Sequence, residues 1–180
     1  VAMTLITTTT ITNQLFTSYS ESVGYGAAFG SLMVTVAMLS DIAWNPLIGF
    51  TCDKFGADKG VILWCAVTIL SFVCLGVGAS MPAFAFVGAS LNDTMYACYG
   101  TGIAMLTAFL FGNKDYAKIY SLVPAIGYAL GCMGVPILTS IYQATGGYNS
   151  VWLFCAACDA VIALCVILAA RNSKKLPRSE

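Results

Sequence analysis

Long apolar runs, separated by short breaks of polar residues, glycine and proline, occupy almost all of the 180-residue chain. A hydrocarbon core of ~30 Å is crossed by about 20 helical residues, whereas a membrane-spanning strand needs only about ten alternating residues. The runs have the helical length, and they predict six spans: Ala2–Tyr19, Ala27–Phe50, Val61–Ser80, Ala83–Phe111, Ile119–Tyr142 and Ser150–Ala170. We therefore expect an all-α membrane protein, with a bundle of six transmembrane helices over residues 1–170 and a basic cytoplasmic tail over residues 171–180.

The composition supports a lipid environment and excludes several classes of function. Apolar residues make up 59% of the chain and charged residues 9%, against roughly 25% charged residues in a soluble domain. The formal net charge is zero, so no basic surface for nucleic acid is expected. The chain contains no histidine, which excludes a histidine-based catalytic triad or metal site within it. We expect no metal, no cofactor and no enzymatic activity, and we expect the cysteines inside the apolar runs to pack as small hydrophobic residues.

The basic residues predict an orientation in the membrane. All of them fall in the second break, the fourth break or the C-terminal tail: Lys54, Lys59, Lys114, Lys118, Arg171, Lys174, Lys175 and Arg178. These segments lie on one side of a membrane if the six spans alternate in direction. Because Lys and Arg concentrate in cytoplasmic loops, both ends of the chain are expected to be cytoplasmic, in a plasma (inner) membrane.

Three carboxylates lie inside predicted spans, far from either end. At a rise of 1.5 Å per residue, Asp41 is ~13 Å from Phe50, Asp93 is ~15 Å from Ala83, and Asp159 is ~14 Å and ~16 Å from the two ends of its span. A charged Asp at such depth costs about 2.5–3.5 kcal/mol on insertion scales. No Lys or Arg is available inside the spans to pair with them. We interpret Asp93 as functional and expect Asp159 to be structural because its span is otherwise apolar, while the sequence leaves Asp41 open between the two.

Polar side chains accompany two of these positions at helical spacing. Asn92, Asp93, Tyr96 and Tyr99 recur every three or four residues and share one stripe of the fourth span. A second stripe follows the first span through Thr10, Asn13, Gln14 and Thr17. Two such stripes are typical of a water-filled pathway, although hydrogen bonds between helices, worth about 0.6–2 kcal/mol each, would also explain them. The candidate solute or proton pathway residues are Asp93, Asn92, Tyr96, Asp41, Asn13 and Gln14.

Glycine and proline interrupt the second and the fifth spans. The second contains Gly30 at its mouth and Pro46 inside, and the fifth contains Pro124, Gly131 and Pro136. These two spans occupy matching positions if the chain is divided into three plus three spans. Paired interrupted spans of this kind indicate an inverted repeat of an alternating-access transporter, and ordinary close packing of membrane helices is the alternative.

The second break carries the most specific motif of the chain. Gly49, Asp53, Lys54 and Gly56 match the G-x-x-x-D-[RK]-x-G-x-[RK]-[RK] loop signature of the major facilitator superfamily, which this segment resembles, although Asp58 replaces a basic residue. The segments 111–117 and 142–148 are similar to later loops of the same superfamily. The resemblance implies that the chain is the C-terminal six-helix half of a twelve-helix transporter, whose N-terminal half is missing. It also implies a conformational gating role for the loop, in which Asp53 would contact a helix of that half.

Within the superfamily, the short loops look most like the monocarboxylate and oxalate/formate exchanger branch. The expected function is secondary active transport of a small organic solute by alternating access, with an organic anion as the expected solute and coupling to protons or to exchange. Asp93 would be the leading proton-carrying group and Asp41 the second. A non-transporting membrane receptor or scaffold subunit is the main alternative. A six-span channel and an intramembrane aspartyl protease are weaker ones, because neither a selectivity filter nor a paired carboxylate motif at short spacing is found.

Overall fold

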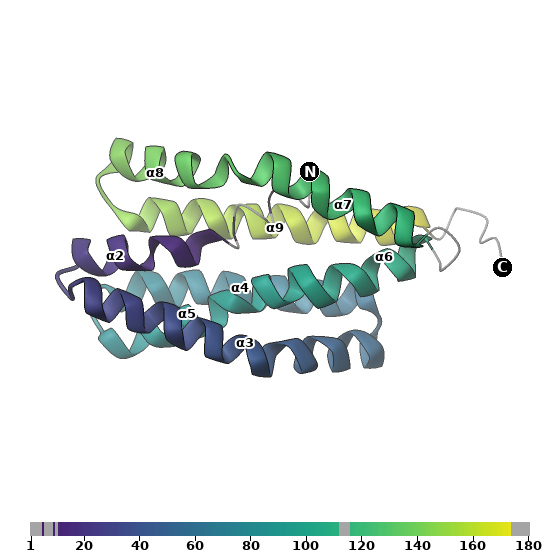
Figure 1. Ribbon diagram of the computed structural model, residues 1–180, viewed down its shortest axis with the longest axis horizontal. Coiled ribbons are helices and arrows are strands. Elements are labelled where there is room, and N and C mark those ends of the chain that lie inside the picture. Colours follow the sequence, from purple (N-terminus) through teal and green to yellow (C-terminus); the bar gives the residue numbers. More distant parts are fainter. Residues whose placement is uncertain (1–4, 6–8, 10, 112–115, 174–180) are drawn as a thin grey trace.

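The computed structural model describes residues 11–111 and 116–173, together with positions 5 and 9, and the regular elements within them are helical. The elements follow one another in this order: the 3₁₀ helix η1 (Ile11–Leu15), α2 (Phe16–Ser22), α3 (Ala27–Phe55), α4 (Ala57–Gly78), α5 (Pro82–Ala97), the π-helical turn η2 (Cys98–Gly102), α6 (Ile103–Phe111), α7 (Tyr116–Gly131), α8 (Gly134–Thr145) and α9 (Tyr148–Ser173). They form an elongated bundle (Figure 1). The expectation of an all-α protein is confirmed.

Five spans in the described part of the chain are long and apolar enough to cross a membrane. They are α3, α4, the continuous run α5–η2–α6, the pair α7–α8, and α9. The first predicted span, Ala2–Tyr19, lies partly outside the described residues, and its second half forms η1 and α2. The number of six spans and the inverted repeat therefore stay predictions.

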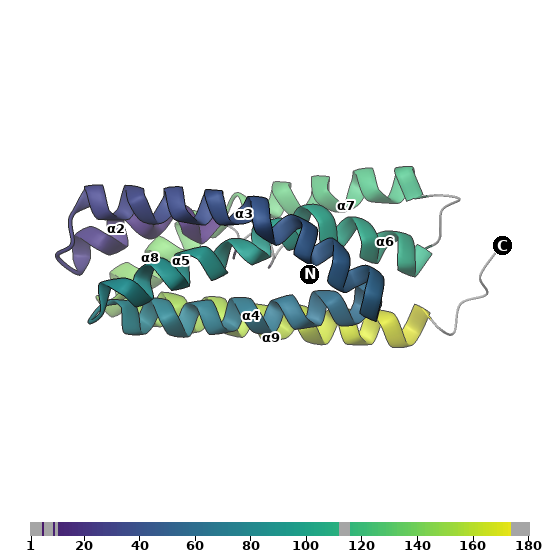
Figure 2. The same cartoon turned by 90° about the horizontal axis from the view of Figure 1, so that it is seen from below.

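The long helices alternate in direction, so that the connections gather at two opposite ends of the bundle. The α3–α4 junction, the start of α7 and the end of α9 lie together at the right of Figures 1 and 2. The α2–α3 link, the α4–α5 link and the α8–α9 turn lie at the left. All the basic residues that the structure describes belong to segments at the right-hand end: Lys54, Lys59, Lys118 and Arg171.

Two hydrophobic clusters fill the bundle, one toward each end. The cluster toward the α3–α4 junction contains Ile48, Val61 and Ile162, and the other contains Phe16 and Leu75. Between them, a layer of buried polar side chains crosses η1, α4, α5 and α9, at Thr12, Thr68, Asn92, Asp93, Thr94 and Asp159. The bundle thus has apolar packing near its ends and polar groups at mid-height.

The two spans that were predicted to be interrupted differ from each other in the structure. Helix α3 continues through Pro46, whereas the fifth span is divided into α7 and α8 at Cys132. The π-helical turn η2 in the fourth span was not predicted. In α3, the Asn45 side chain hydrogen-bonds the backbone oxygen of Asp41 at 3.1 Å. The Thr101 hydroxyl in η2 donates to Asn45 Oδ1 at 2.8 Å, which joins η2 to the part of α3 just before Pro46.

Candidate functional site

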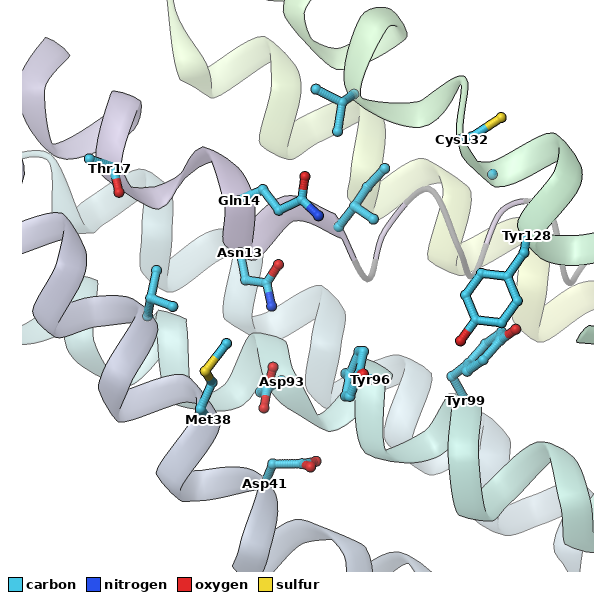
Figure 3. Close-up of a pocket in the computed structure, with 14 residues that line it drawn as sticks. Asn13, Gln14, Thr17, Met38, Asp41, Asp93, Tyr96, Tyr99, Tyr128 and Cys132 are labelled. Carbon is cyan, nitrogen blue, oxygen red and sulfur yellow. The ribbon is translucent and has the colours of Figure 1, made fainter.

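A cavity of about 790 Å³ opens at mid-height of the bundle. The residues that line it come from η1, α2, α3, α5, η2, α7 and α8: Ile11, Asn13, Gln14, Thr17, Val34, Met38, Asp41, Asp93, Tyr96, Tyr99, Tyr128, Gly131, Cys132 and Val135 (Figure 3). None of these residues comes from α4 or α9. The bundle therefore has a front layer of helices that line the cavity and a rear layer, α4 and α9, that contributes no residue to the lining.

Five of the six predicted pathway residues line this cavity. Asn13 and Gln14 reach it from η1, Asp41 from α3, and Asp93 and Tyr96 from α5. Figure 3 shows Asn13, Asp93, Tyr96 and Asp41 grouped around the same part of the cavity. The helical spacing that placed Asp93 and Tyr96 on one stripe thus brings them to a common surface with residues of two other segments.

Asn92, the sixth predicted residue, is absent from the lining. It is buried, and its Oδ1 lies 2.8 Å from the Thr12 hydroxyl, which also lies 2.7 Å from the backbone oxygen of Thr9. A hydroxyl has a single hydrogen, so Thr12 can donate to one of these acceptors at a time. The Asn92 Nδ2 group has no hydrogen-bond partner. Asn92 thus links α5 to η1 directly behind the cavity surface.

The two carboxylates of the cavity lie within electrostatic range of each other. Asp93 is 3% exposed, and within the described part of the chain no group donates a hydrogen bond to its carboxylate. One oxygen of Asp41 is also buried without a partner. Buried carboxylates are normally hydrogen-bonded or paired with a cation. Asp93 lacks such a partner within the described residues, whereas the half-buried Asp41 has the side-chain amide of Asn45 beside it.

Hydrogen bonds between α3 and α5 hold the helices that carry Asp41 and Asp93 against each other. The Trp44 indole donates to the backbone oxygen of Ser90 at 2.8 Å, and the Ser90 hydroxyl lies 2.7 Å from that of Ser40. Ser40 and Trp44 flank Asp41 in the sequence, and Ser90 lies one helical turn before Asp93. The polar contacts therefore fix the register of the helices that carry the two acids.

Aromatic side chains form the other wall of the cavity. The rings of Tyr99 and Tyr128 meet edge to face, with centroids 5.3 Å apart, and Figure 3 shows this pair beside Tyr96. The side chains of Tyr96 and Tyr128 are 52% and 61% exposed, so their ring surfaces are open for contact. Tyr128 was not predicted to belong to the site, because the spacing within one span does not show which residues of another span it will face.

A cysteine also lines the cavity, contrary to the expectation that all the cysteines in apolar runs are packed. Cys132 lies between α7 and α8 and is exposed, while its thiol donates to the backbone oxygen of Ala129 at 3.1 Å. The glycines on either side of it, Gly131 and Gly134, were the sequence signal for this break. The interruption of the fifth span therefore lies at the cavity wall.

The predicted gating loop lies at the end of the bundle and contributes no residue to the cavity lining. Gly56 separates α3 from α4 with φ of 95°, a conformation that glycine adopts without strain. The Lys54 ammonium lies 5.6 Å and 5.5 Å from the ring centroids of Phe50 and Phe55, and Asp53 is exposed. A β-carbon on Gly49 would make an ordinary contact, 4.0 Å from Thr101.

Asp159, the third carboxylate within the spans, lies outside the cavity. Its side chain is completely buried on α9, and Thr9 is the polar side chain that faces it. The residues that the structure describes include no group of three Cys, Asp or Glu side chains that could hold a metal ion.

Comparison with protein families agrees with this architecture. The family model described as Major Facilitator Superfamily matches residues 1–180, the whole chain. No curated protein and no solved structure matches the chain. Since the family model covers the chain from end to end, the protein belongs to the major facilitator superfamily and is one of its membrane transporters.

Proposed function

We propose that the protein is a secondary active transporter, which carries a small organic solute through the cavity by alternating access. The observation that supports this most strongly is the composition of the lining, where two carboxylates, two amides and three tyrosines meet at mid-height of apolar helices. Polar groups at such depth are retained in membrane proteins mainly along substrate and ion pathways. The volume of about 790 Å³ is in the range that small-molecule sites occupy.

Asp93 and Asp41 are the proposed proton-carrying groups, Asp93 first. Low-dielectric surroundings and a second carboxylate nearby disfavour two negative charges in one place. No hydrogen-bond donor within the described residues stabilises the Asp93 carboxylate. Such a pair is suited to binding a proton from one side of the membrane and releasing it on the other.

The irregular points of the lining helices are the proposed places of movement. Helices α7 and α8 meet at a break in the cavity wall, and η2 lies next to Asn45–Pro46 of α3. Proline and π-turns allow helices to bend. We propose that α7–α8 and the η2 region rearrange as the cavity opens to one side or the other.

The remaining parts of the proposal follow the resemblance. The six-helix unit over residues 1–170 would be the C-terminal half of a twelve-helix fold, arranged as a three-plus-three inverted repeat, with an N-terminal half covering the open side of the cavity. Asp53 and its loop would contact that half. The clustering of Lys54, Lys59, Lys118 and Arg171 at one end supports cytoplasmic termini, in a plasma (inner) membrane.

The charge of the solute is the point on which the cavity and the exchanger resemblance diverge. The monocarboxylate and oxalate/formate branch implies an organic anion. The lining contains no Lys or Arg among the described residues, so an anion would need its cation from the N-terminal half.

The experiment is a proton-flux assay on the full-length transporter in proteoliposomes that contain a pH-sensitive dye. We expect transporter-dependent proton movement, measured against protein-free liposomes, on addition of at least one of tetraethylammonium, acetate and oxalate, each tested separately. In Asp93→Asn the pH dependence of transport should be lost, because the side chain can no longer bind or release a proton. Asp159→Asn is the matched control, since it makes the same chemical change away from the cavity.

Two results would contradict the proposal. If none of the probes moves protons and none is taken up, a receptor or scaffold role is favoured over transport. If transport and its pH dependence are unchanged in Asp93→Asn, the assignment of that residue is wrong.

A further inference from the structure

We propose that the cavity binds an organic cation. Asp93 and Asp41 would neutralise its ammonium group, and the rings of Tyr96, Tyr99 and Tyr128 would surround it. This inference rests on the proposed transport function and specifies its substrate class. The solute would be a protonated amine or a quaternary ammonium compound. It would differ in sign from the anion that the resemblance implies.

The first argument is charge. Two carboxylates line the cavity, and neither Lys nor Arg is among its lining residues. The described basic residues, Lys54, Lys59, Lys118 and Arg171, belong to segments at one end of the bundle. In a low-dielectric cavity, uncompensated carboxylates attract a cation far more strongly than they would in water.

The second argument is the state of Asp93. Asp93 is only 3% exposed and lines the cavity, and its carboxylate accepts no hydrogen bond from the described residues. A buried carboxylate without donors is costly unless it is protonated or has a cation beside it. The ammonium group of a solute would supply that cation. When the solute leaves, the Asp93 carboxylate would bind a proton in its place.

The third argument is the aromatic wall. The faces of tyrosine rings attract cations, by about 0.5–1 kcal/mol at exposed sites and about 2 kcal/mol when water is excluded. Tyr99 and Tyr128 meet edge to face at 5.3 Å, and Tyr96 is exposed beside Asp93 in Figure 3. Carboxylates combined with several tyrosine rings suit an alkylated ammonium, which is charged and apolar at once. A small metal ion would instead require converging ligands, and none are grouped in this way within the described residues.

A cation and a proton would compete for the same carboxylates. The titratable groups that share the cavity with Asp93 are Asp41 of α3, Tyr96 of α5, Tyr99 of η2, Tyr128 of α7 and Cys132, and η1 contributes the uncharged amides of Asn13 and Gln14. The described lining therefore holds two acids and no permanent cation. Binding of the solute cation should displace a proton, which corresponds to exchange of the cation for protons across the membrane.

The test is equilibrium binding of tetraethylammonium to the purified full-length transporter, with acetate and oxalate as anionic probes. Tetraethylammonium should bind, and at fixed pH its binding should release protons. Asp93→Asn should weaken binding about 100-fold, as expected when one partner of a desolvated charge pair is removed. Asp93→Glu should recover part of this loss, and Asp159→Asn should change binding by less than about threefold, because its side chain lies outside the cavity.

Two variants of Tyr99 distinguish the contribution of its ring to cation binding from the contribution of its hydroxyl group. Tyr99→Leu should weaken tetraethylammonium binding about tenfold, because the ring face is lost, whereas Tyr99→Phe should stay within about threefold. Thermal unfolding of each variant establishes that it is folded.

The proposal is overturned if acetate or oxalate binds and moves protons while tetraethylammonium does not, an outcome that leaves the transport function itself intact. It is also overturned if tetraethylammonium binds equally well to the wild type, Asp93→Asn and Tyr99→Leu, because the cation would then bind elsewhere. Absence of any binding or transport with all three probes would count against the transport function as well.

Discussion

Asp93 and Asp159 are the same residue type and both are buried, yet only Asp93 lines the cavity. Asp93 belongs to the front layer, where η1, α3, α5 and α7–α8 surround the cavity. Asp159 belongs to the rear layer, where α9 packs against α4, and its side chain has no exposed surface. A carboxylate within a span is therefore a guide to function only together with a cavity that reaches it.

The span formed by α5, η2 and α6 is packed tightly at one point and loosely at another. Helices α4 and α5 approach each other at Gly88, where a β-carbon would lie 2.9 Å from the backbone nitrogen of Leu75. In η2, a β-carbon on Gly100 would meet nothing within 4 Å. The contact between α4 and α5 at Gly88 therefore resists rearrangement, whereas η2 has room around Gly100.

The largest expected difference between the layers is the reactivity of their thiols. Cys132 is exposed at the cavity, whereas Cys155 is completely buried on α9. In single-cysteine variants, a methanethiosulfonate reagent should label Cys132 about 100-fold faster than Cys155, because the latter reacts only after local opening. Reaction rates can be followed by mass spectrometry. Equal rates would show that the rear layer is as accessible as the cavity.

A glycine pair on the same span tests the packing difference. Gly88→Ala should lower the free energy of unfolding by about 1–3 kcal/mol, because the added methyl group overpacks the α4–α5 contact. Gly100→Ala should leave stability within about 0.5 kcal/mol, since its surroundings are open. Denaturant titration of the purified variants measures both. The comparison fails if Gly100→Ala is the more destabilising change.

The smallest expected effect concerns the contact between η2 and α3. Thr101→Val removes the 2.8 Å hydrogen bond to Asn45, and such bonds in membrane proteins are worth about 0.6–1.7 kcal/mol. If that bond stabilises one state of the cavity, uptake should fall about threefold to tenfold while the protein stays folded. Thr35→Val is the control, because the Thr35 hydroxyl bonds its own helix at Ser31. Equal effects of the two variants on uptake would show that the hydrogen bond between Thr101 and Asn45 does not stabilise one state of the cavity.

Much of this arrangement could be predicted from the sequence, because membrane thickness and helical period act locally along the chain. Span lengths gave the all-α class, and the three- and four-residue spacing placed Asp93 and Tyr96 on one surface. The same spacing placed Asn92 on that surface, but tertiary packing against Thr12 turns it away from the cavity.

The rest depends on contacts between spans, which no local pattern contains. Tyr128 and Cys132 join the cavity because α7–α8 lies across from α5 in the bundle. The π-helical turn η2 was not expected, since its sequence is an ordinary apolar and glycine-containing segment. The loop signature also did not indicate the close helix approach at Gly60, where a β-carbon would lie 3.0 Å from the Cα of Cys52.

The most direct test compares two variants of the full-length transporter, Asp93→Asn and Asp159→Asn, each reconstituted in proteoliposomes. The quantity measured is the rate at which each variant takes up the transported solute. The two substitutions are chemically identical and differ in whether the side chain reaches the cavity. We expect Asp93→Asn to reduce uptake about 100-fold and Asp159→Asn to stay within about threefold of the wild type. Equal losses in two folded variants, or a larger loss in Asp159→Asn, would contradict the assignment of the transport pathway to this cavity.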